Sequence, residues 1–419
     1  MLHPLRTGRW LWPAIAVIFV LSCGLPADDA HSDDSHRISA GVSWATSLAT
    51  VRPGDTVRLA EGMHGPQLLQ NRDFGGVTVL GTSRSTTVVA GLYLKNVQGL
   101  TFRGFSVTSS AAATSAVRVT DNSSNIVFSR LRVAPRNDAS GFDIFSNSGS
   151  SRPPHNIKVT HSTYSGANAW GRTARGVRLF GGSADPATWP HHIVIRRSDI
   201  GYAPADAIQI GGARQVRIVG NRIHDVQENA DHNDGIQSYG SDGLFIARNR
   251  LWASGADGGP DQAIMLAHSP TDDSYLRVSN TKIVNNIVTG WRGQGISLSG
   301  TSETWVMNNT SVSNGGSSFV VGTAFGPNEH LRVFNNIFDN IYRFDRAAIW
   351  YENYNLVGRG GEGSQDLSKE PRFSDTSSWA LDHNSPAIDR GQENGAPKID
   401  FAGRVRTGRP DLGAQEQAR

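Results

Sequence analysis

Two aspartates recur in the same short pattern near the middle of the chain. Asp206 and Asp234 each begin a segment of the form Asp-small-Ile-Gln, and the segments end at Gln209 and Gln237. If the two segments are neighbouring strands, the carboxylates lie about 5 Å apart. Carboxylates that close repel each other, so the pair needs a bound cation, a shared proton or a raised pKa. The structural alternative is that each aspartate caps the turn before its strand.

A cation bound by the two aspartates would be Ca²⁺, because carboxylate and amide oxygens are its usual ligands. The predicted metal ligands are Asp206, Asp231, Asn233 and Asp234. The side-chain amides of Gln209 and Gln237 are predicted to complete the set. A shared proton would instead indicate acid–base chemistry.

Two further side chains near Asp234 are suited to proton transfer. His232 is the predicted general base, because the unperturbed pKa of imidazole lies near neutrality. Tyr239 follows in the same segment and is predicted to exchange a proton with the substrate. The predicted catalytic residues are therefore Asp206, His232, Asp234 and Tyr239. The residues predicted to contact the substrate are Arg175, Arg178, Gln209, Gln237, His268 and Arg292, and the alternative for each is an ordinary surface or loop role.

The element that must position these residues is a short strand that recurs along the chain. Its pattern is a small residue, an apolar residue and then a side chain that strand alternation exposes. The exposed residues of the seven copies are Arg118, Asp143, Arg178, Gln209, Gln237, Met265 and Ser297. The copies recur at intervals of roughly 30 residues, which indicates repeated structural units.

A second recurring segment keeps the same period. Each of its later copies follows a strand-like run and begins with Asn, at Asn221, Asn249, Asn286, Asn309 and Asn336. Earlier, degenerate copies have Arg130, Ser162 and Ser198 at that position. Asn at a sharp turn tolerates positive φ, and stacked Asn amides can bond to one another along a column.

Two columns with one shared, elastic period predict an all-β solenoid, a parallel β-helix. Strands of three to five residues are not stable alone. Stacked in parallel at ~4.8 Å, they bury a continuous apolar interior and pair one another's backbone groups. A leucine-rich horseshoe is the main rival solenoid, but its leucine spacing is absent from this chain.

The first residues are typical of an export signal. Arg6 and Arg9 flank the start of an apolar run over residues 10–21, which is short for a membrane span of ~20 residues. The only cysteine, Cys23, ends this run in a pattern similar to a bacterial lipobox. Residues 1–23 are therefore predicted to be a signal peptide, with either a lipid anchor at Cys23 or ordinary secretion. We expect an exported bacterial protein: periplasmic, an outer-membrane lipoprotein or extracellular.

The rest of the chain divides by composition. Residues 24–37 are predicted to be a polar tether, residues 38–365 the β-helix with an N-terminal cap, and residues 366–419 an irregular C-terminal cap. Solenoids need atypical terminal units to cover their open ends. The formal net charge is +3 and the arginines are scattered along the sequence. The charge pattern therefore does not indicate that the protein binds nucleic acid. A monomer is expected.

Segments near both ends resemble the pectate-lyase-like superfamily. The similar segments are residues 53–57 with 61–62, 385–391, 400–406 and 411–416. The resemblance spans residues 40–416 and implies a right-handed parallel β-helix that handles polysaccharide. It does not imply one reaction, because lyases, hydrolases, epimerases and non-catalytic adhesins share this fold.

A column of side chains on such a fold suits a long polymer, because successive sugars can meet successive coils. The favoured function is a lyase or C5-epimerase acting on a uronic-acid polymer. Arg178 or Ca²⁺ would neutralise the uronate carboxylate, His232 would remove the C5 proton, and Tyr239 would protonate the leaving oxygen. One alternative is a glycoside hydrolase that uses Asp206 and Asp234 as acid and base. The other is a non-catalytic polysaccharide-binding or surface protein.

Overall fold

The computed structural model describes residues 36–110, 113–147, 152–167, 174–227, 233–254, 261–268, 277–344 and 349–417. These ranges lie in one compact unit, His36–Arg419. Residues 1–35, including Cys23, fall outside the described ranges, so the signal peptide, the anchor and the tether stay predictions. In the part of the chain that the structure describes, no helix has the length and apolar character needed to cross a membrane.

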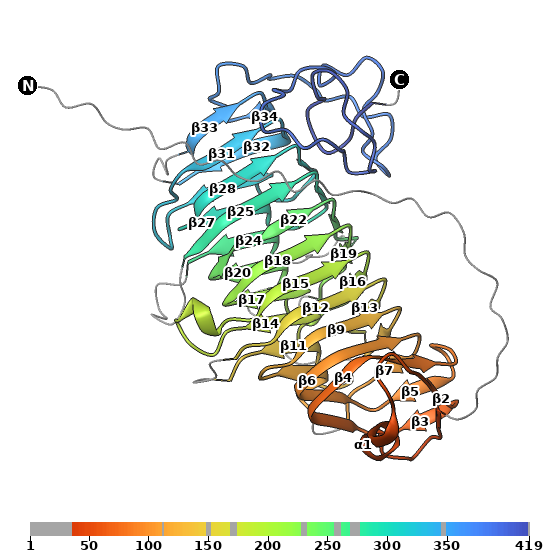
Figure 1. Cartoon of the computed structure of the whole chain (residues 1–419). Coiled ribbons are helices and arrows are strands. Elements are labelled where there is room, and N and C mark those ends of the chain that lie inside the picture. Colours follow the sequence, from red (N-terminus) through yellow and green to blue (C-terminus); the bar gives the residue numbers. More distant parts are fainter. Residues whose placement is uncertain are drawn as a thin grey trace, which may run out of the picture. The chain divides into compact units, whose positions relative to one another are not determined.

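The unit is a stack of coils in which the strands form three parallel columns (Figure 1). Column 1 contains β8 (Ser115–Thr120), β11 (Ser140–Phe145), β14 (Val177–Phe180), β17 (Ile208–Gly211), β20 (Asp234–Tyr239), β24 (Gln262–Ala267), β27 (Gln294–Ser299) and β30 (Phe319–Gly322). Column 2 contains β1 (Arg37–Ile38), β2 (Thr56–Leu59), β9 (Ser124–Ser129), β12 (His155–Thr160), β15 (His191–Arg196), β18 (Ala213–Val219), β21 (Ser241–Asp242), β22 (Phe245–Ala247), β25 (Val278–Val284), β28 (Ser302–Met307), β31 (Leu331–Phe334) and β33 (Ile349–Asn353).

Column 3 contains β3 (Gly62–His64), β5 (Thr87–Val89), β7 (Ser106–Val107), β10 (Arg132–Val133), β13 (Thr163–Ser165), β16 (Asp199–Gly201), β19 (Arg222–His224), β23 (Arg250–Trp252), β26 (Ile287–Thr289), β29 (Thr310–Val312) and β34 (Leu356–Arg359). Three long strands turn a corner and serve two columns: β4 (Gln67–Gly81), β6 (Leu92–Arg103) and β32 (Ile337–Arg343). The helical elements are α1 (Trp44–Ser47) and the 3₁₀ turns η2 (Leu48–Thr50) and η3 (Pro186–Thr188).

The strand register confirms the predicted parallel β-helix. In column 1, Ile208 pairs with Ile236 and Gln209 pairs with Gln237. The same register continues along column 1. The stacked positions are Arg118, Asp143 and Arg178 in the preceding coils, and Met265 and Ser297 in the following ones. Positions roughly 30 residues apart are therefore stacked neighbours, as the repeat predicts.

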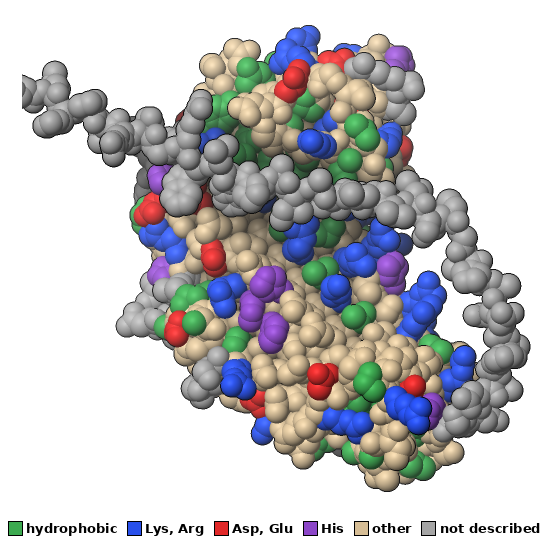
Figure 2. All heavy atoms as spheres, viewed as in Figure 1, with side chains coloured by type: hydrophobic (Ala, Val, Ile, Leu, Met, Phe, Trp, Pro, Cys, Tyr) green, Lys and Arg blue, Asp and Glu red, His purple; other side chains and the backbone are tan. Residues whose placement is uncertain are grey.

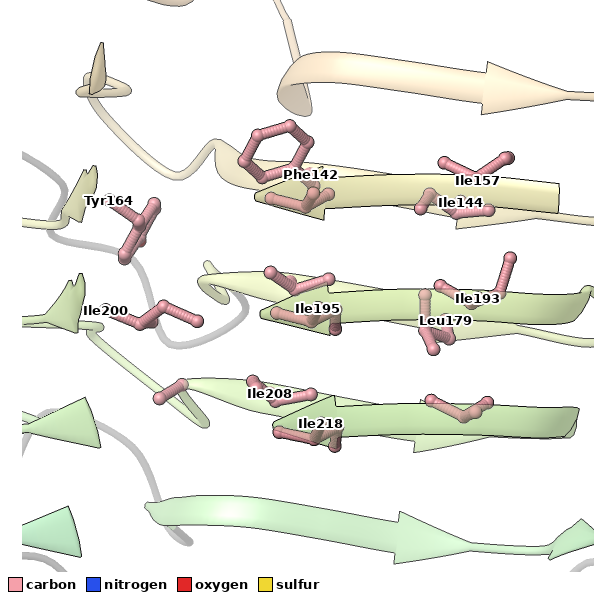
Figure 3. Packing of buried hydrophobic residues seen from close by; sticks show 14 of the residues in the cluster. Phe142, Ile144, Ile157, Tyr164, Leu179, Ile193, Ile195, Ile200, Ile208 and Ile218 are labelled. Atoms are coloured by element: carbon pink, nitrogen blue, oxygen red, sulfur yellow. The ribbon is translucent and has the colours of Figure 1, made fainter. Parts of the chain in front are cut away.

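Apolar side chains from all three columns fill the interior of the stack. Figure 3 shows Leu179 of column 1, Ile195 of column 2 and Ile200 of column 3 within one layer. All three are at most 2% exposed. Strand alternation explains the arrangement, since successive side chains point to opposite faces and one face of every strand is turned inward.

An asparagine ladder joins the coils at the corner between columns 2 and 3. Asn221 donates from its backbone N and its Nδ2 to Oδ1 of Asn249, at 2.9 Å in both cases. The same two bonds link Asn249 to Asn286 and continue through later coils. Each ladder asparagine thus satisfies a buried backbone N–H of the coil before it, which confirms the predicted bonding along this column.

Two details of the predicted corner are wrong. Positive φ falls on the residue before the ladder position, as at Asn285 (φ 53°) and Asn308 (φ 52°), and not on the ladder asparagine itself. The early copy assigned to Arg130 is also shifted by one residue. Arg132 pairs with Thr163, so the ladder position is Leu131, whose backbone N–H bonds to Ser162 Oγ at 3.1 Å. Arg130 occupies the preceding, positive-φ position (φ 53°).

Both ends of the described stack have irregular coverings. At the first coils, α1 and η2 bury Trp44 and Leu48 against the apolar interior. After β34 the described chain forms isolated bridges and contacts the ladder corner, where Asn285 Nδ2 donates to the carbonyl of Ile399 at 2.7 Å. The domain boundaries at residues 37 and 365 stay predictions.

Candidate functional site

The two aspartates of the sequence pattern lie in one column, one coil apart. Asp206 and Asp234 are 2% and 0% exposed. Asp206 Oδ1 accepts the backbone N–H of Asp234 at 3.0 Å, and Asp234 Oδ1 accepts the backbone N–H of Gln262 at 3.1 Å. Each carboxylate therefore caps the start of the strand in the next coil. This is the structural role that the sequence left open for them.

The second oxygen of each carboxylate accepts a glutamine amide. Gln209 Nε2 donates to Asp206 Oδ2 at 2.9 Å and to Gln237 Oε1 at 2.8 Å. Gln237 Nε2 donates in turn to Asp234 Oδ2 at 3.0 Å. The four side chains form one continuous hydrogen-bonded ladder across two coils, and we call it the Asp–Gln ladder.

The Asp–Gln ladder as arranged does not fit a Ca²⁺ ion. Every carboxylate oxygen of Asp206 and Asp234 accepts an N–H at 2.9–3.1 Å, and the glutamine amides present Nε2 hydrogens to these oxygens. Calcium ligands must instead direct oxygen lone pairs at the ion. Among the described residues no group of three or more His, Cys, Asp or Glu could hold a metal. Asp231 lies outside the described residues, so calcium stays a prediction.

A charged cluster occupies the earlier coils of the same column. Asp143 is 1% exposed and accepts two hydrogen bonds from Arg178, from Nε at 2.9 Å and from a terminal nitrogen at 3.0 Å. Arg118 reaches the same carboxylate at 3.3 Å. The side chains of Arg118 and Arg178 remain 35% and 34% exposed. Two cations share one buried anion, so the outer face here has an excess of positive charge.

Arg175 and Tyr239 lie near the Asp–Gln ladder. Arg175 Nε is 3.7 Å from Asp206 Oδ2, and burial is the main cause that lowers the pKa of this guanidinium. Burial, and next the negative charges of Asp234 and Asp206, raise the pKa of Tyr239 well above its ordinary value. The phenol therefore keeps its proton at neutral pH and can act as a proton donor.

The other predicted site residues lie in different places. His268 follows Ala267, the last residue of β24, and Ala267 pairs with Tyr239. His268 and Tyr239 therefore lie in adjacent coils at the same end of their strands, and the two aspartates lie at the other end. Arg292 forms an ion pair with Asp261 at 3.1 Å, in the residue position before Gln262. Asn233 is buried and precedes β20. The predicted base His232 and the predicted ligand Asp231 lie outside the described residues.

A titratable cluster that the sequence analysis did not predict lies at column 3. His224 in column 3 bonds through Nε2 to Asp199 at 2.8 Å and through Nδ1 to Asp225 at 2.9 Å. Its ring also stacks on Trp252 with centroids 4.5 Å apart. Burial by itself lowers the pKa of His224, but the two carboxylates outweigh it and the pKa is raised. The repeat period was the available signal, because it places Asp199 and His224 in adjacent coils.

Comparisons with known proteins agree with this fold. Residues 174–356 match the family described as "Right handed beta helix region". The chain is similar to the structure of pectate lyase Pel9A, at 16% identity with a TM-score of 0.52, covering 90% of this chain and 91% of that one. No curated protein matches the chain.

Two further solved structures are similar at lower scores. One is the PL6 family polysaccharide lyase Pedsa3628 from Pseudopedobacter saltans, at 12% identity with a TM-score of 0.47, covering 91% of this chain and 100% of that one. The other is PfbA, a surface adhesin of Streptococcus pneumoniae, at 11% identity with a TM-score of 0.48, covering 77% and 86%. The strand columns, the family match and the Pel9A comparison together identify the fold of this chain as a right-handed parallel β-helix.

Proposed function

We propose that the outer face of column 1 acts on a uronic-acid-containing polysaccharide as a lyase or C5-epimerase. The observation that carries the proposal is the shared carboxylate of Asp143, which holds Arg118 and Arg178 side by side and partly exposed. Guanidinium groups in a fixed position suit the bidentate recognition of a carboxylate, which every uronate unit carries.

Asp143 fixes the positions of Arg118 and Arg178 but neutralises only one of their two positive charges. Two guanidinium groups face one carboxylate, so a net positive charge remains for a substrate carboxylate. Neutralising that carboxylate makes the adjacent C5 proton easier to remove, because negative charge develops there in the transition state. Gln209 continues the same row in the next coil and is partly exposed, so a neighbouring sugar can reach it. Gln237 is 2% exposed and its amide is bonded within the Asp–Gln ladder, so its predicted contact with the substrate is not supported.

In the lyase reaction a base takes the C5 proton, a C4–C5 double bond forms and the C4–O bond breaks, with a proton passing to the leaving oxygen. His232 is the proposed base. Tyr239 is the proposed donor to the leaving oxygen, because its phenol carries a proton at neutral pH and lies in the same column as the Asp–Gln ladder. In the epimerase reaction no C–O bond breaks and a proton returns to C5 from the opposite face.

Hydrolysis by Asp206 and Asp234 is less well supported. A hydrolase needs one carboxyl group to donate a proton and the other to activate water or attack the sugar. Both carboxylates here are buried, and their oxygens accept backbone and amide N–H groups of the protein itself. That arrangement suits strand capping better than contact with a sugar.

The test is to incubate the full chain with uronate polymers and follow the ultraviolet absorbance of unsaturated product, with NMR for inversion at C5. Arg178→Gln should lower turnover by a factor of about 10² or more, since it removes the neutralising contact. Arg178→Lys should recover part of the loss, and Arg58→Gln, an exposed arginine of column 2, should match wild type. New reducing ends without unsaturated product would establish hydrolysis instead. Binding with no product of any kind would establish a non-catalytic module.

A further inference from the structure

Positive charge gathers on the outer face of column 2, away from the Asp–Gln ladder. The residues are Lys158, Arg196, Arg197, Arg217 and Arg248, which we call the basic groove. In Figure 2, which shares the view of Figure 1, Lys and Arg side chains gather over the middle of this face with few acidic side chains among them. None of the residues lining the two hollows at this place is Asp or Glu.

The basic groove is a continuous depression in the surface. One hollow of about 590 Å³ is lined by residues of β9, β12, β15, β18 and β22. A second of about 550 Å³ shares Lys158, Val194 and Arg217 with the first, and Phe401 of the C-terminal segment lines it too. Five consecutive coils at strand spacing span roughly 20 Å, which is long enough for several units of a polymer and too long for one small anion.

In the described part of the chain, no carboxylate lines either hollow beside these cations. Lys158, Arg196, Arg197 and Arg217 are exposed, and Arg196 donates a hydrogen bond to the neutral Thr160 at 3.4 Å. Arg217 and Arg248 line the same hollow. Burial, and next the positive charge of Arg248, lower the pKa of Arg217, so the two positive charges repel each other. An anionic ligand would relieve that repulsion, because opposite charge nearby favours the charged form of each arginine.

We propose that the basic groove is a second binding site, separate from column 1, for a chain of an acidic polysaccharide. Val127 and Val194 provide an apolar floor for sugar rings between the cations. Sites for single-stranded nucleic acid depend on aromatic faces on which bases stack. Here the ring of Phe245 is covered by Arg217 at 4.4 Å, and Phe401 packs against the buried cluster of the C-terminal segment. The other ring among the described lining residues is the small imidazole of His192, so the groove has no row of aromatic faces. The groove therefore favours a sugar polymer over a nucleic acid.

The ligand of the basic groove must be a polyanion, and its binding there does not depend on the reaction at column 1. A polymer held in the groove would keep its remaining length near the solenoid, which raises the effective concentration of sugars at a second site on the same molecule. Loss of the groove should therefore affect long polymers and leave short uronate oligomers unaffected.

The test compares two triple variants of the full chain by affinity electrophoresis in polygalacturonate, in neutral dextran and in no polymer. The groove variant is Lys158→Gln with Arg217→Gln and Arg248→Gln. The control variant is Arg58→Gln with Arg132→Gln and Arg359→Gln, which removes the same charge from exposed arginines elsewhere. Thermal unfolding confirms that both variants fold.

The groove variant should bind polygalacturonate on the order of tenfold or more weakly than wild type, and the control variant should bind nearly as wild type. Wild-type binding should weaken as salt rises, because exposed charges are screened. Equal losses in both variants, or no loss in the groove variant, would overturn the proposal. Tighter binding to single-stranded DNA than to polygalacturonate would overturn the assignment to a sugar polymer. If the groove variant binds weakly and the wild-type protein shows no turnover, the groove proposal stands and only the proposed reaction at column 1 is contradicted.

Discussion

Substitutions of Asp234 test whether its carboxylate stabilises the start of the next strand or takes part in the reaction. Its Oδ1 accepts the Gln262 backbone N–H at 3.1 Å and its Oδ2 accepts Gln237 Nε2 at 3.0 Å, in a side chain that is 0% exposed. Asp234→Ala leaves both donors without these acceptors. A buried donor left unpaired costs about 1–3 kcal/mol, so the loss of both acceptors should lower the unfolding free energy by about 2–6 kcal/mol. Asp234→Asn keeps one acceptor oxygen and should lose about 1 kcal/mol, the net value of one hydrogen bond.

The assay is urea unfolding followed by far-ultraviolet circular dichroism. Gln294→Ala is the matched control, because Gln294 continues the same column two coils beyond Asp234 and is partly exposed. It should lie within about 0.5 kcal/mol of wild type, as most surface substitutions do. Wild-type stability of Asp234→Ala would refute the capping role. A chelator that destabilises wild type as much as the alanine substitution does would show that the carboxylates hold a cation.

Three further outcomes are expected. Asn286→Ala removes the acceptor of two buried donors of Asn249 and should lower the unfolding free energy by about 2–4 kcal/mol in urea. A loss smaller than that of the exposed control Arg58→Gln would contradict the stabilising role of the asparagine ladder. The raised pKa of His224 means that its stabilising contribution is complete below the unfolded value of about 6.5 and is lost as pH rises through the folded pKa. His224→Gln should therefore flatten the pH dependence of the melting temperature above about pH 6, and an unchanged profile would disprove this linkage. Tyr239→Phe should slow formation of unsaturated product by a factor of about 10²–10⁴ without lowering the melting temperature, and wild-type turnover would remove Tyr239 from the proton donors.

The sequence was sufficient to predict the columns because their physical cause is local and repeated. A small residue, an inward apolar residue and an outward side chain define one strand, and the register of Gln209 with Gln237 follows from repeating that pattern. The asparagine corner was also predictable, although positive φ falls on the preceding residue, as at Asn285. The ladder asparagine must direct its amide along the column, and the tight turn is made one residue earlier.

Residues that meet through different coils were harder to predict. Lys158, Arg197, Arg217 and Arg248 are separated by 20 residues or more, so the sequence presents them as scattered charges. Stacking brings them onto one face. The same holds for His224 and Asp199, which meet across adjacent coils, whereas Asp225 is next to His224 in the sequence. The repeat identifies which strands are neighbours, whereas the loops between strands vary in length and decide which long side chains meet.

A crystal structure with a bound uronate oligomer tests the proposed site most directly. We predict an oligomer along the outer face of column 1, with one uronate carboxylate within hydrogen-bonding distance of Arg178 and a glycosidic or ring oxygen near Tyr239. An oligomer that leaves column 1 empty and binds elsewhere on the protein would contradict the assignment of the reaction to this face.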